Sequence, residues 1–324
     1  MKRLLFGVLG ILISIFAIYY ISKNISFVES WEQIQKIASG HIAILMLIYL
    51  CSFVPRAYRW QLMLKNYPNV KFEAFLKATL VGFAGNNFIP ARGGELLRME
   101  YFSRDTKISR VTALASVLTE KILDGLALLL FLILGVALSP IDVLKLSWLK
   151  NLLILAAALF LGALIAMLFL KMKHDFISRL LKNRNHNRFI KFLERLHDKI
   201  QSALTFLKLS NSTIQIVGAS ILIWLIEAAV FILALQFLEI EIHPLAAGFL
   251  MLSIVNFGIL LPSSPAYLGV FQGMSILALT LFNIPQTTGL TVGVLVHFCQ
   301  FVPVSLIGIL LVSLSILNTK IKDF

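Results

Sequence analysis

Two polar, proline-broken segments interrupt an otherwise apolar chain, and they hold the residues best suited to chemistry. The first runs from Gly85 to Arg98 and contains two asparagines, a proline, two arginines, a pair of glycines and a glutamate. The second runs from Asn256 to Gly269 and contains an asparagine, two serines and two prolines. In a bilayer, irregular backbone is tolerated only where it is buried in protein or lines a cavity. Two such breaks at matching places of two halves therefore point to a transport site.

The first break combines the features of a tight turn and a helix start. Pro90 removes a backbone donor, and Gly93 and Gly94 free the backbone for the turn. A half-helix is expected to begin near Glu95 and to continue through Arg98. A carboxylate at a helix start stabilises that helix. Glu95 therefore either caps the helix or pairs with Arg98, or it binds a cationic headgroup or carries a proton.

The donors of the first break suit an anionic ligand. Free N–H groups at a helix start bind anions, and the planar fork of Arg92 or Arg98 matches a phosphate. Asn86 and Asn87 add neutral donors and acceptors. Together these residues predict that a phosphate group is held at this break.

Three charged residues lie close together in the apolar run 111–138. Glu120 and Asp124 are four positions apart and share one helix face, with Lys121 beside them. Charges at this depth are costly and usually face a cavity or a partner. The expected basic partners come from the first break and from the end of the run 42–64, namely Arg92, Arg98, Arg56 and Arg59.

The second half of the chain carries one acid and several neutral polar residues. Glu227 lies in the middle of the run 214–238, with no neighbouring residue in the sequence to neutralise it. Because an unpaired buried carboxylate protonates, Glu227 is a candidate proton site. A structural hydrogen bond to Gln272, Gln300 or a serine is the alternative. The candidate site residues around the second break are Asn256, Pro262, Ser263, Ser264, Pro265, Gly269 and Gln272.

The composition is that of an integral membrane protein. Of the 324 residues, 59% are hydrophobic and 14% are charged, and the mean hydropathy is +0.88. Soluble domains carry about 25% charged residues. Apolar runs of the ~20 residues needed to cross the hydrocarbon lie near 4–22, 42–64, 111–138, 152–170, 214–238 and 287–315. Two further apolar pairs, 73–108 and 245–283, are interrupted by the breaks.

Several other classes of protein are excluded by what the sequence lacks. Cys51 and Cys299 lie within apolar runs, so neither a disulfide framework nor a thiolate metal site is expected. His41 and His297 stand alone, and we expect packed histidines rather than metal ligands, with no metal and no cofactor. No nucleophile elbow, P-loop or dinucleotide-binding fingerprint occurs. The run 4–22 ends without a small-residue cleavage site, which favours an uncleaved first helix over a signal peptide.

The net charge of +13 is arranged for a membrane rather than for nucleic acid. Ten Lys and Arg residues lie between Lys171 and Lys208, and ten more lie between Arg56 and Arg110. Basic loops stay in the cytoplasm, so both termini are expected there, in a cell-membrane protein without a nucleic-acid partner. Apolar residues at helical spacing from Phe189 to Leu207 predict an amphipathic helix on the inner leaflet, within the loop 171–210. A soluble helical hairpin packed on the membrane domain is the alternative.

With the basic loops inside, the topology predicts one polytopic domain over 1–324 with two similar halves. Each half has a span, a hairpin broken at a proline and another span, namely 42–64, 73–108 and 111–138, then 214–238, 245–283 and 287–315. Pro90 and Pro262 are separated by the same distance as the first residues of the two halves. We expect an all-α protein of about six full spans and two re-entrant hairpins, in an inverted repeat of 42–138 and 214–315. Eight plain spans with two proline kinks are the alternative.

Four motifs of the chain resemble those of the lysylphosphatidylglycerol synthase transmembrane family, and the resemblance covers roughly 40–315. The motifs are Asn86-x-x-x-Pro90-x-Arg92-Gly93-Gly94-Glu95-x-x-Arg98, Glu120-Lys121-x-x-Asp124, Pro262-Ser263-Ser264-Pro265-x-x-x-Gly269-Val270 and Arg56-x-x-Arg59-Trp60. The family often has arginine at Lys121, glycine near Ala266 and glutamate at Gln272. The glutamine at the last position leaves the outer half of the site without the acid that the family pattern implies.

The resemblance implies the handling of membrane lipids. Members flip aminoacylated phosphatidylglycerol between leaflets, and relatives move isoprenoid-like or sterol-like lipids. Large members also carry a soluble aminoacyl-transfer domain after the membrane domain. This sequence reaches Phe324 a few residues beyond the last expected span, so we expect neither that domain nor phosphatidylglycerol lysyltransferase chemistry.

Functions of two classes agree with these residues. In the first, the protein is a lipid flippase or transporter whose partners are membrane phospholipids. Arg92, Arg98 and the hairpin backbone then hold the phosphate. Glu95, Glu120 and Asp124 meet a cationic headgroup or relay protons. In the second, it is a membrane enzyme that transfers an aminoacyl or glycosyl group to a lipid, or an accessory subunit of a separate lipid-modifying enzyme.

Overall fold

The computed structural model describes residues 25–90, 92–140, 142, 145–172, 211–260 and 264–322, and also residues 12, 15, 16, 18, 19, 21 and 23. The regular elements in these ranges are helices, which confirms the all-α prediction for them. They are α2 (Phe27–Gln35), α3 (Ser39–Cys51), α4 (Phe53–Met63), α5 (Phe72–Phe88), α6 (Gly94–Thr106), α7 (Arg110–Ala137), α8 (Ser147–Met172), α11 (Asn211–Phe237), α12 (Pro244–Gly258), the short 3-10 helix η3 (Pro265–Tyr267), α13 (Val270–Thr280) and α14 (Gln286–Lys322). The predicted amphipathic helix in 171–210 and most of the predicted span 4–22 lie outside the described residues.

Four of the described helices are long and apolar enough to cross a membrane, so the chain is a membrane protein. They are α3 continued by α4 (Ser39–Met63), most of α8 (Ser147–Phe169), α11 (Asn211–Phe237) and most of α14 (Gln286–Leu317). Each of them covers one predicted span. Helix α7 covers the predicted span 111–138 but carries Glu120, Lys121 and Asp124. By length and composition, the described helices therefore support four of the six expected full spans.

Large apolar side chains face outward along two of these long helices. Leu155 and Ile165 on α8 and Leu306 and Leu310 on α14 are each more than half exposed. Lipid tails are as apolar as leucine, so a bilayer covers such side chains where water would not. The outward faces of α8 and α14 thus fit a membrane environment.

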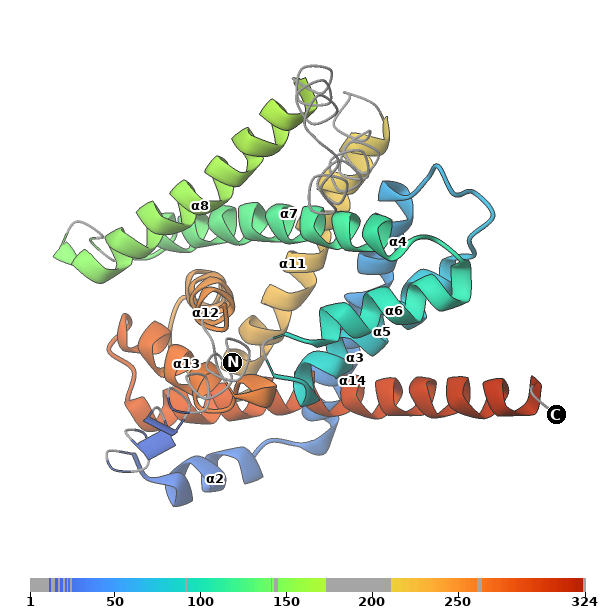
Figure 1. Ribbon diagram of the computed structural model, residues 1–324. Coiled ribbons are helices and arrows are strands. Elements are labelled where there is room, and N and C mark those ends of the chain that lie inside the picture. The colour runs from blue at the N-terminus through green and yellow to red at the C-terminus, as the bar shows by residue number, and fades with distance from the viewer. Residues whose placement is uncertain are drawn as a thin grey trace.

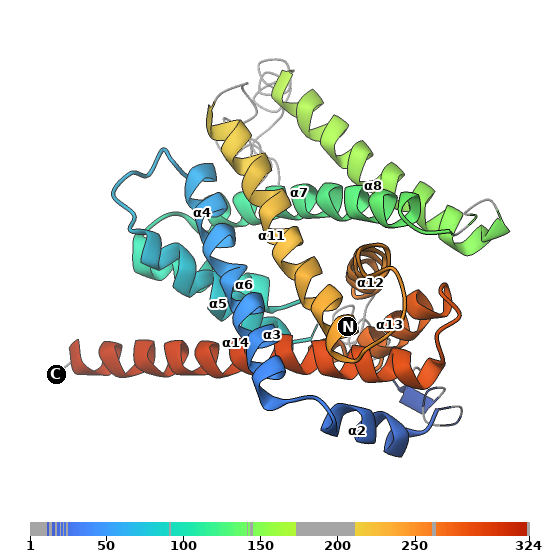
Figure 2. The same cartoon turned by 180° about the vertical axis from the view of Figure 1, so that it is seen from behind.

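The two halves of the chain contain corresponding elements that run in opposite directions. The first half consists of α3 with α4, the pair α5–α6 and α7; the second consists of α11, the pair α12–α13 and α14. Figures 1 and 2 show α4 antiparallel to α11 and α7 antiparallel to α14. Each helix pair packs against the long helix of the other half, α5 on α14 and α12 on α7. This exchange brings the two breaks of the sequence together.

Aromatic packing anchors the helix that follows the first break. The indole of Trp60 on α4 lies 5.3 Å from the ring of Phe75 on α5 and 4.3 Å from that of Phe102 on α6, measured between centroids. All three side chains are fully buried. A larger apolar cluster runs through α7, α11, α12 and α14. The two clusters hold α6 and the start of α7 at fixed positions around the centre of the molecule.

Polar caps start the helices that follow the loops. Thr112 N donates to Ser109 Oγ at 3.2 Å at the start of α7. Ala246 N donates to His243 Nδ1 at 3.2 Å at the start of α12, where Pro244 takes the first position. The first N–H groups of a helix have no partner within it, and these caps supply one.

The turn in the first break is made by Arg92 and not by the glycines. Arg92 has φ 56°, in the left-handed region, whereas Gly93 has φ −61°, in the helical region. The prediction that the two glycines provide the conformational freedom of the turn is therefore wrong. Gly94 is required by close packing instead, because a Cβ there would lie 2.1 Å from Gly82 O and 2.3 Å from Asn86 N.

Candidate functional site

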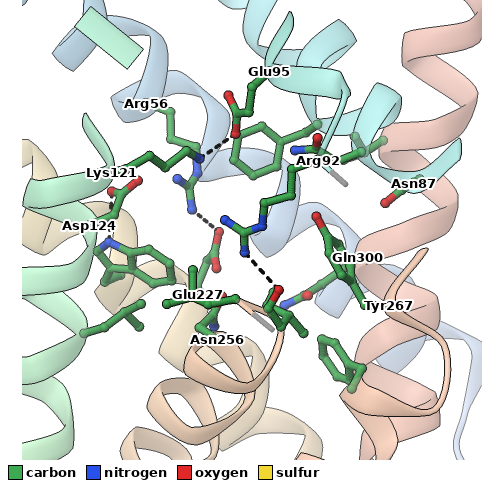
Figure 3. Close-up of a pocket in the computed structure, with 18 of the residues that line it drawn as sticks. Arg56, Asn87, Arg92, Glu95, Lys121, Asp124, Glu227, Asn256, Tyr267 and Gln300 are labelled. Atoms are coloured by element: carbon green, nitrogen blue, oxygen red, sulfur yellow. Dashed lines mark hydrogen bonds and ion pairs between the residues drawn. The ribbon is translucent and has the colours of Figure 1, made fainter. Parts of the chain in front are cut away.

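A cavity of about 190 Å³ lies between the two breaks, as Figure 3 shows. Helices of both halves contribute side chains to it, α3 to α7 from the first and α11 to α14 from the second, and α8 adds Phe160. Nine residues that the sequence singled out line the cavity, namely Arg56, Asn86, Asn87, Arg92, Glu95, Lys121, Asp124, Glu227 and Asn256. The fold therefore gathers most of the candidate charged groups in one place.

Other candidate residues do not line this cavity. In the first half these are Arg59, Pro90, Gly93, Gly94, Arg98 and Glu120. In the second half they are Ser264, Pro265, Gly269 and Gln272. Pro262 and Ser263 lie outside the described residues.

Aromatic side chains form much of the cavity wall, and the sequence did not single them out. They are Tyr49, Phe83, Phe160, Trp224, Tyr267, Phe271 and Phe301. Aromatic residues are common in apolar spans, so residue type alone carried no signal. Trp224 lies three positions before Glu227, and residues at this spacing share a helix face. That spacing was the available signal for Trp224.

Arg56 of α4 neutralises Glu227 of α11. The two side chains are only 4% and 6% exposed. The interpretation of Glu227 as an unpaired carboxylate is therefore wrong, because a partner that lies 171 positions away in the sequence reaches it through the fold. The guanidinium carbon of Arg56 also lies 4.8 Å from the ring centroid of Phe83 and 5.2 Å from that of Trp224. Cation–π contacts thus hold Arg56 from two further sides.

Asp124 accepts hydrogen bonds from two helices. Arg59 Nη1 donates to Asp124 Oδ1 at 2.7 Å, and Trp224 Nε1 donates to the same oxygen at 3.2 Å. Arg59 Nη1 also donates to Ser220 Oγ at 3.0 Å. Arg59 was among the predicted partners of Asp124, and this prediction is confirmed. The pair links α4, α7 and α11 at the edge of the cavity.

Arg98 forms a two-point ion pair away from the cavity. Arg98 Nη1 lies 2.6 Å from Glu120 Oε2, and Nη2 lies 3.3 Å from Oε1. The guanidinium carbon lies 3.8 Å from the ring of Trp60, and Arg98 is 2% exposed. Glu120 was expected to pair with a nearby arginine, which is confirmed, but the expected pair between Glu95 and Arg98 is wrong. Arg98 is buried, paired with a carboxylate and outside the cavity lining, so it is not placed to meet a ligand there.

Glu95 pairs with Lys121 inside the cavity. The distance between Glu95 Oε1 and Lys121 Nζ is 2.6 Å, and Figure 3 shows this contact beside Arg56. Glu95 Oε2 is buried and has no hydrogen-bond partner in the described part of the protein. Asn86 Oδ1 is in the same situation. The cavity therefore contains two buried acceptors with capacity for a donor.

Arg92 reaches into the middle of the cavity from the first break (Figure 3). Its Nη2 donates to the carbonyl oxygen of Ile259 at 3.2 Å, and its guanidinium carbon lies 6.0 Å from the ring centroid of Tyr267. Its Nε is buried without a hydrogen-bond partner. Among the described residues, no carboxylate forms an ion pair with Arg92. The three cavity carboxylates already have basic partners, so Arg92 contributes one uncompensated positive charge.

Comparison with known families identifies the chain. Residues 7–308 match the family described as lysylphosphatidylglycerol synthase TM region. The chain belongs to this family. The match includes both breaks and the whole cavity lining, and it confirms the resemblance seen in the motifs. No curated protein and no solved structure matches the chain.

In this member of the lysylphosphatidylglycerol synthase transmembrane family, the second half contributes Glu227 and several neutral polar side chains to the cavity. Asn256, Tyr267 and Gln300 face the charged groups of the first half in Figure 3. His297 also lines the cavity, and its Nδ1 lies 3.0 Å from Gln272 Nε2. His297 is buried and stacks on Phe271, so the expectation of a packed histidine is confirmed, and it has a polar partner in addition. Membership of the family supports a role connected with membrane lipids.

Proposed function

We propose that this protein is a flippase-like transporter that moves a phosphate-bearing lipid between membrane leaflets. The observation that carries the proposal is the uncompensated positive charge of Arg92 in a cavity with largely aromatic and aliphatic walls. Arg92 is partly buried, and a charge that is moved away from water without a counter-charge is costly. A phosphodiester carries one negative charge and can accept two hydrogen bonds from a guanidinium. A lipid phosphate would therefore complete the site, and membrane phospholipids are the expected partners.

The two buried acceptors extend the proposal to the rest of the headgroup. Glu95 Oε2 and Asn86 Oδ1 have no donor in the described part of the protein. A buried acceptor that lacks a partner costs free energy, and an ammonium group on the lipid would supply the missing hydrogen bonds. A headgroup with both a phosphate and an amine, such as aminoacylated phosphatidylglycerol, fits Arg92 and these acceptors at the same time.

The paired charges serve as a framework in this proposal. Breaking a buried ion pair costs several kcal/mol, so the pairs Arg56–Glu227 and Arg59–Asp124 keep α4, α7 and α11 together. Within the described part of the chain, Arg92 makes a carbonyl contact and an aromatic contact but no ion pair. It is the cavity cation that can exchange its partners for a ligand at the lowest cost.

The antiparallel arrangement of the two halves supports the same mechanism. Transporters with inverted repeats bind their substrate between the repeats, where broken helices meet. In the proposed membrane topology, α5–α6 enters from the cytoplasm and α12–α13 enters from the opposite face, as two re-entrant hairpins. Both termini then lie in the cytoplasm, and the protein lies in the cell membrane.

Leaflet exchange of labelled lipids in liposomes tests the proposal. Purified wild-type protein would be offered phosphatidylglycerol and its lysyl form. Arg92→Ala should slow exchange about tenfold or more, because a charge-assisted hydrogen bond contributes about 1.5–3 kcal/mol. Glu95→Gln should reduce the preference for the lysyl form. Arg104→Ala is the matched control, since Arg104 is an exposed arginine outside the cavity, and it should exchange lipids like the wild type.

Two results would contradict this proposal. Unchanged exchange in Arg92→Ala would show that the phosphate is not held by Arg92. Folded wild-type protein that exchanges no lipid would exclude a flippase acting alone, and would favour the enzymatic or accessory role.

A further inference from the structure

The loop between α12 and α13 holds two residues with side chains in the left-handed region. Ala266 has φ 58° and Tyr267 has φ 57°, whereas the φ of 82° at Gly269 is one that a glycine adopts readily. The left-handed region is unfavourable for residues with a side chain. Such conformations persist only where the surrounding structure holds them, and they cluster at functional sites.

A chain of hydrogen bonds from α13 and α14 holds this loop. Gly269 N donates to Gln272 Oε1 at 2.8 Å. Because Oε1 already accepts this bond, Nε2 of the same amide is the donor to His297 Nδ1 at 3.0 Å. The imidazole of His297 also lies next to the backbone of Ala266. Gln272 and His297 are both buried, and the imidazole stacks on Phe271 with 4.6 Å between centroids.

The loop held in this way presents Tyr267 to Arg92. The guanidinium of Arg92 lies between the ring of Tyr267 and the carbonyl of Ile259, which both belong to the second break. Figure 3 shows Arg92 and Tyr267 approaching each other from the two halves of the chain. The position of the uncompensated cation of the first half therefore depends on the conformation of the loop in the second half.

We propose that His297 and Gln272 are positioning residues, which fix Tyr267 and thereby direct the Arg92 guanidinium into the cavity. The inference rests on the proposed function, in which Arg92 binds the lipid phosphate. It assigns a role to two neutral residues of the second half: Gln272 and His297 hold the loop without adding a charge that would compete with the phosphate for Arg92. Neither residue needs to touch the lipid.

Two substitutions of His297 distinguish the effect of its hydrogen bonds from the effect of its aromatic ring. His297→Phe keeps an aromatic ring to stack on Phe271 but has no ring nitrogen. His297→Gln loses the ring, but its amide can accept from Gln272 and donate to the carbonyl of Ala266. We expect His297→Phe to slow leaflet exchange of phosphate-bearing lipids about tenfold, as for a lost buried hydrogen bond, and His297→Gln to restore at least half of the wild-type rate. A purely structural role predicts the reverse order, because only phenylalanine preserves the packing.

Hydrogen exchange of the backbone amides tests, independently of transport, whether the hydrogen bonds of Gln272 and His297 hold the loop. The segment 264–273, and Gly269 above all, should exchange faster in His297→Phe and in Gln272→Ala than in the wild type. His297→Gln should protect it like the wild type, and α5 should be unaffected in every variant. Unchanged protection of 264–273 in both His297→Phe and Gln272→Ala would overturn the inference. Wild-type protein that exchanges no lipid would refute the proposed function instead. The amide result would still decide whether Gln272 and His297 hold the loop.

Discussion

Arg56 and Arg92 both line the cavity, yet their surroundings differ. Arg56 has a carboxylate partner in Glu227 and two aromatic rings around its guanidinium. Arg92 has one carbonyl and one more distant ring. A guanidinium whose charge is already balanced by a carboxylate gains less from a phosphate. At the residue scale, the partners of each arginine therefore separate a structural cation from one that is available to a ligand.

The Arg56–Glu227 pair makes a prediction about stability. Glu227→Ala should destabilise the protein by about 3 kcal/mol or more, because it leaves a buried arginine without a counter-charge. The double variant Arg56→Met, Glu227→Leu should recover most of that loss, since it removes both charges and keeps the volume. Thermal unfolding in detergent measures both. Glu73→Gln, which breaks the exposed pair with Lys77, is the control and should leave the midpoint unchanged.

An equal loss in the single and the double variant would contradict this account. It would mean that packing around the two side chains, rather than the unpaired charge of Arg56, determines their contribution to stability.

At the scale of elements, α5 and α6 approach so closely that only a glycine fits between them. A Cβ on Gly94 would meet the backbone atoms Gly82 O and Asn86 N, which cannot move without bending α5. A Cβ on Gly93 would meet the side chain of Ile89, which can rotate away. Because α6 carries Glu95 at its start, this close approach determines how deep that carboxylate lies in the cavity.

The contrast between the two glycines can be measured. Gly94→Ala should destabilise the protein by about 2–3 kcal/mol, as overpacking against a fixed backbone does, and should slow lipid exchange. Gly93→Ala should cost less than half of this. Gly218→Ala on α11 has open space around the added methyl and should be neutral or stabilising, because alanine favours a helix over glycine by about 1 kcal/mol. Equal losses in Gly93→Ala and Gly94→Ala would show that the close approach is not what requires a glycine.

At the scale of the whole molecule, the helix pair of each half packs against a long helix of the other half. The pair α5–α6 packs on α14, and the pair α12–α13 packs through α12 on α7. The charged residues of the cavity come mainly from the first half, whereas both halves contribute neutral polar residues. Corresponding helices run in opposite directions in Figures 1 and 2, so the loops that follow the two pairs should lie on opposite faces of the membrane.

Single cysteines at equivalent loops test this orientation. Lys107 follows α6 and Asn283 follows α13, and both have left-handed backbone conformations, with φ 61° and 59°. In a background without Cys51 and Cys299, Lys107→Cys should react with a membrane-impermeant maleimide only from the cytoplasmic side. Asn283→Cys should react only from the outside. Labelling of both positions from one side would exclude the inverted arrangement.

Local features of the chain could be predicted because they depend on neighbouring residues only. The predicted span 214–238 corresponds to the helix Asn211–Phe237, and the predicted span 42–64 corresponds to the helical segment Ser39–Met63. Helix α6 begins at Gly94, one position before the predicted start. Membership of the lipid-related family was also readable from the spacing of the polar motifs. Apolar length, proline positions and motif spacing are properties that a sequence carries directly.

What the tertiary structure decided was the pairing of charges across the molecule. The sequence by itself determined that Glu120, Asp124 and Glu227 lie in apolar helices, where each needs a partner. It did not determine that Glu227 meets Arg56, or that Glu95 meets Lys121 and not Arg98. The sequence offered several arginines as possible partners of each acid. The packing of the two halves determined which of them lie close enough to form an ion pair. Ion pairing is a short-range interaction whose partners are chosen by helix packing, so only the fold could leave Arg92 as a cavity cation with no carboxylate partner among the described residues.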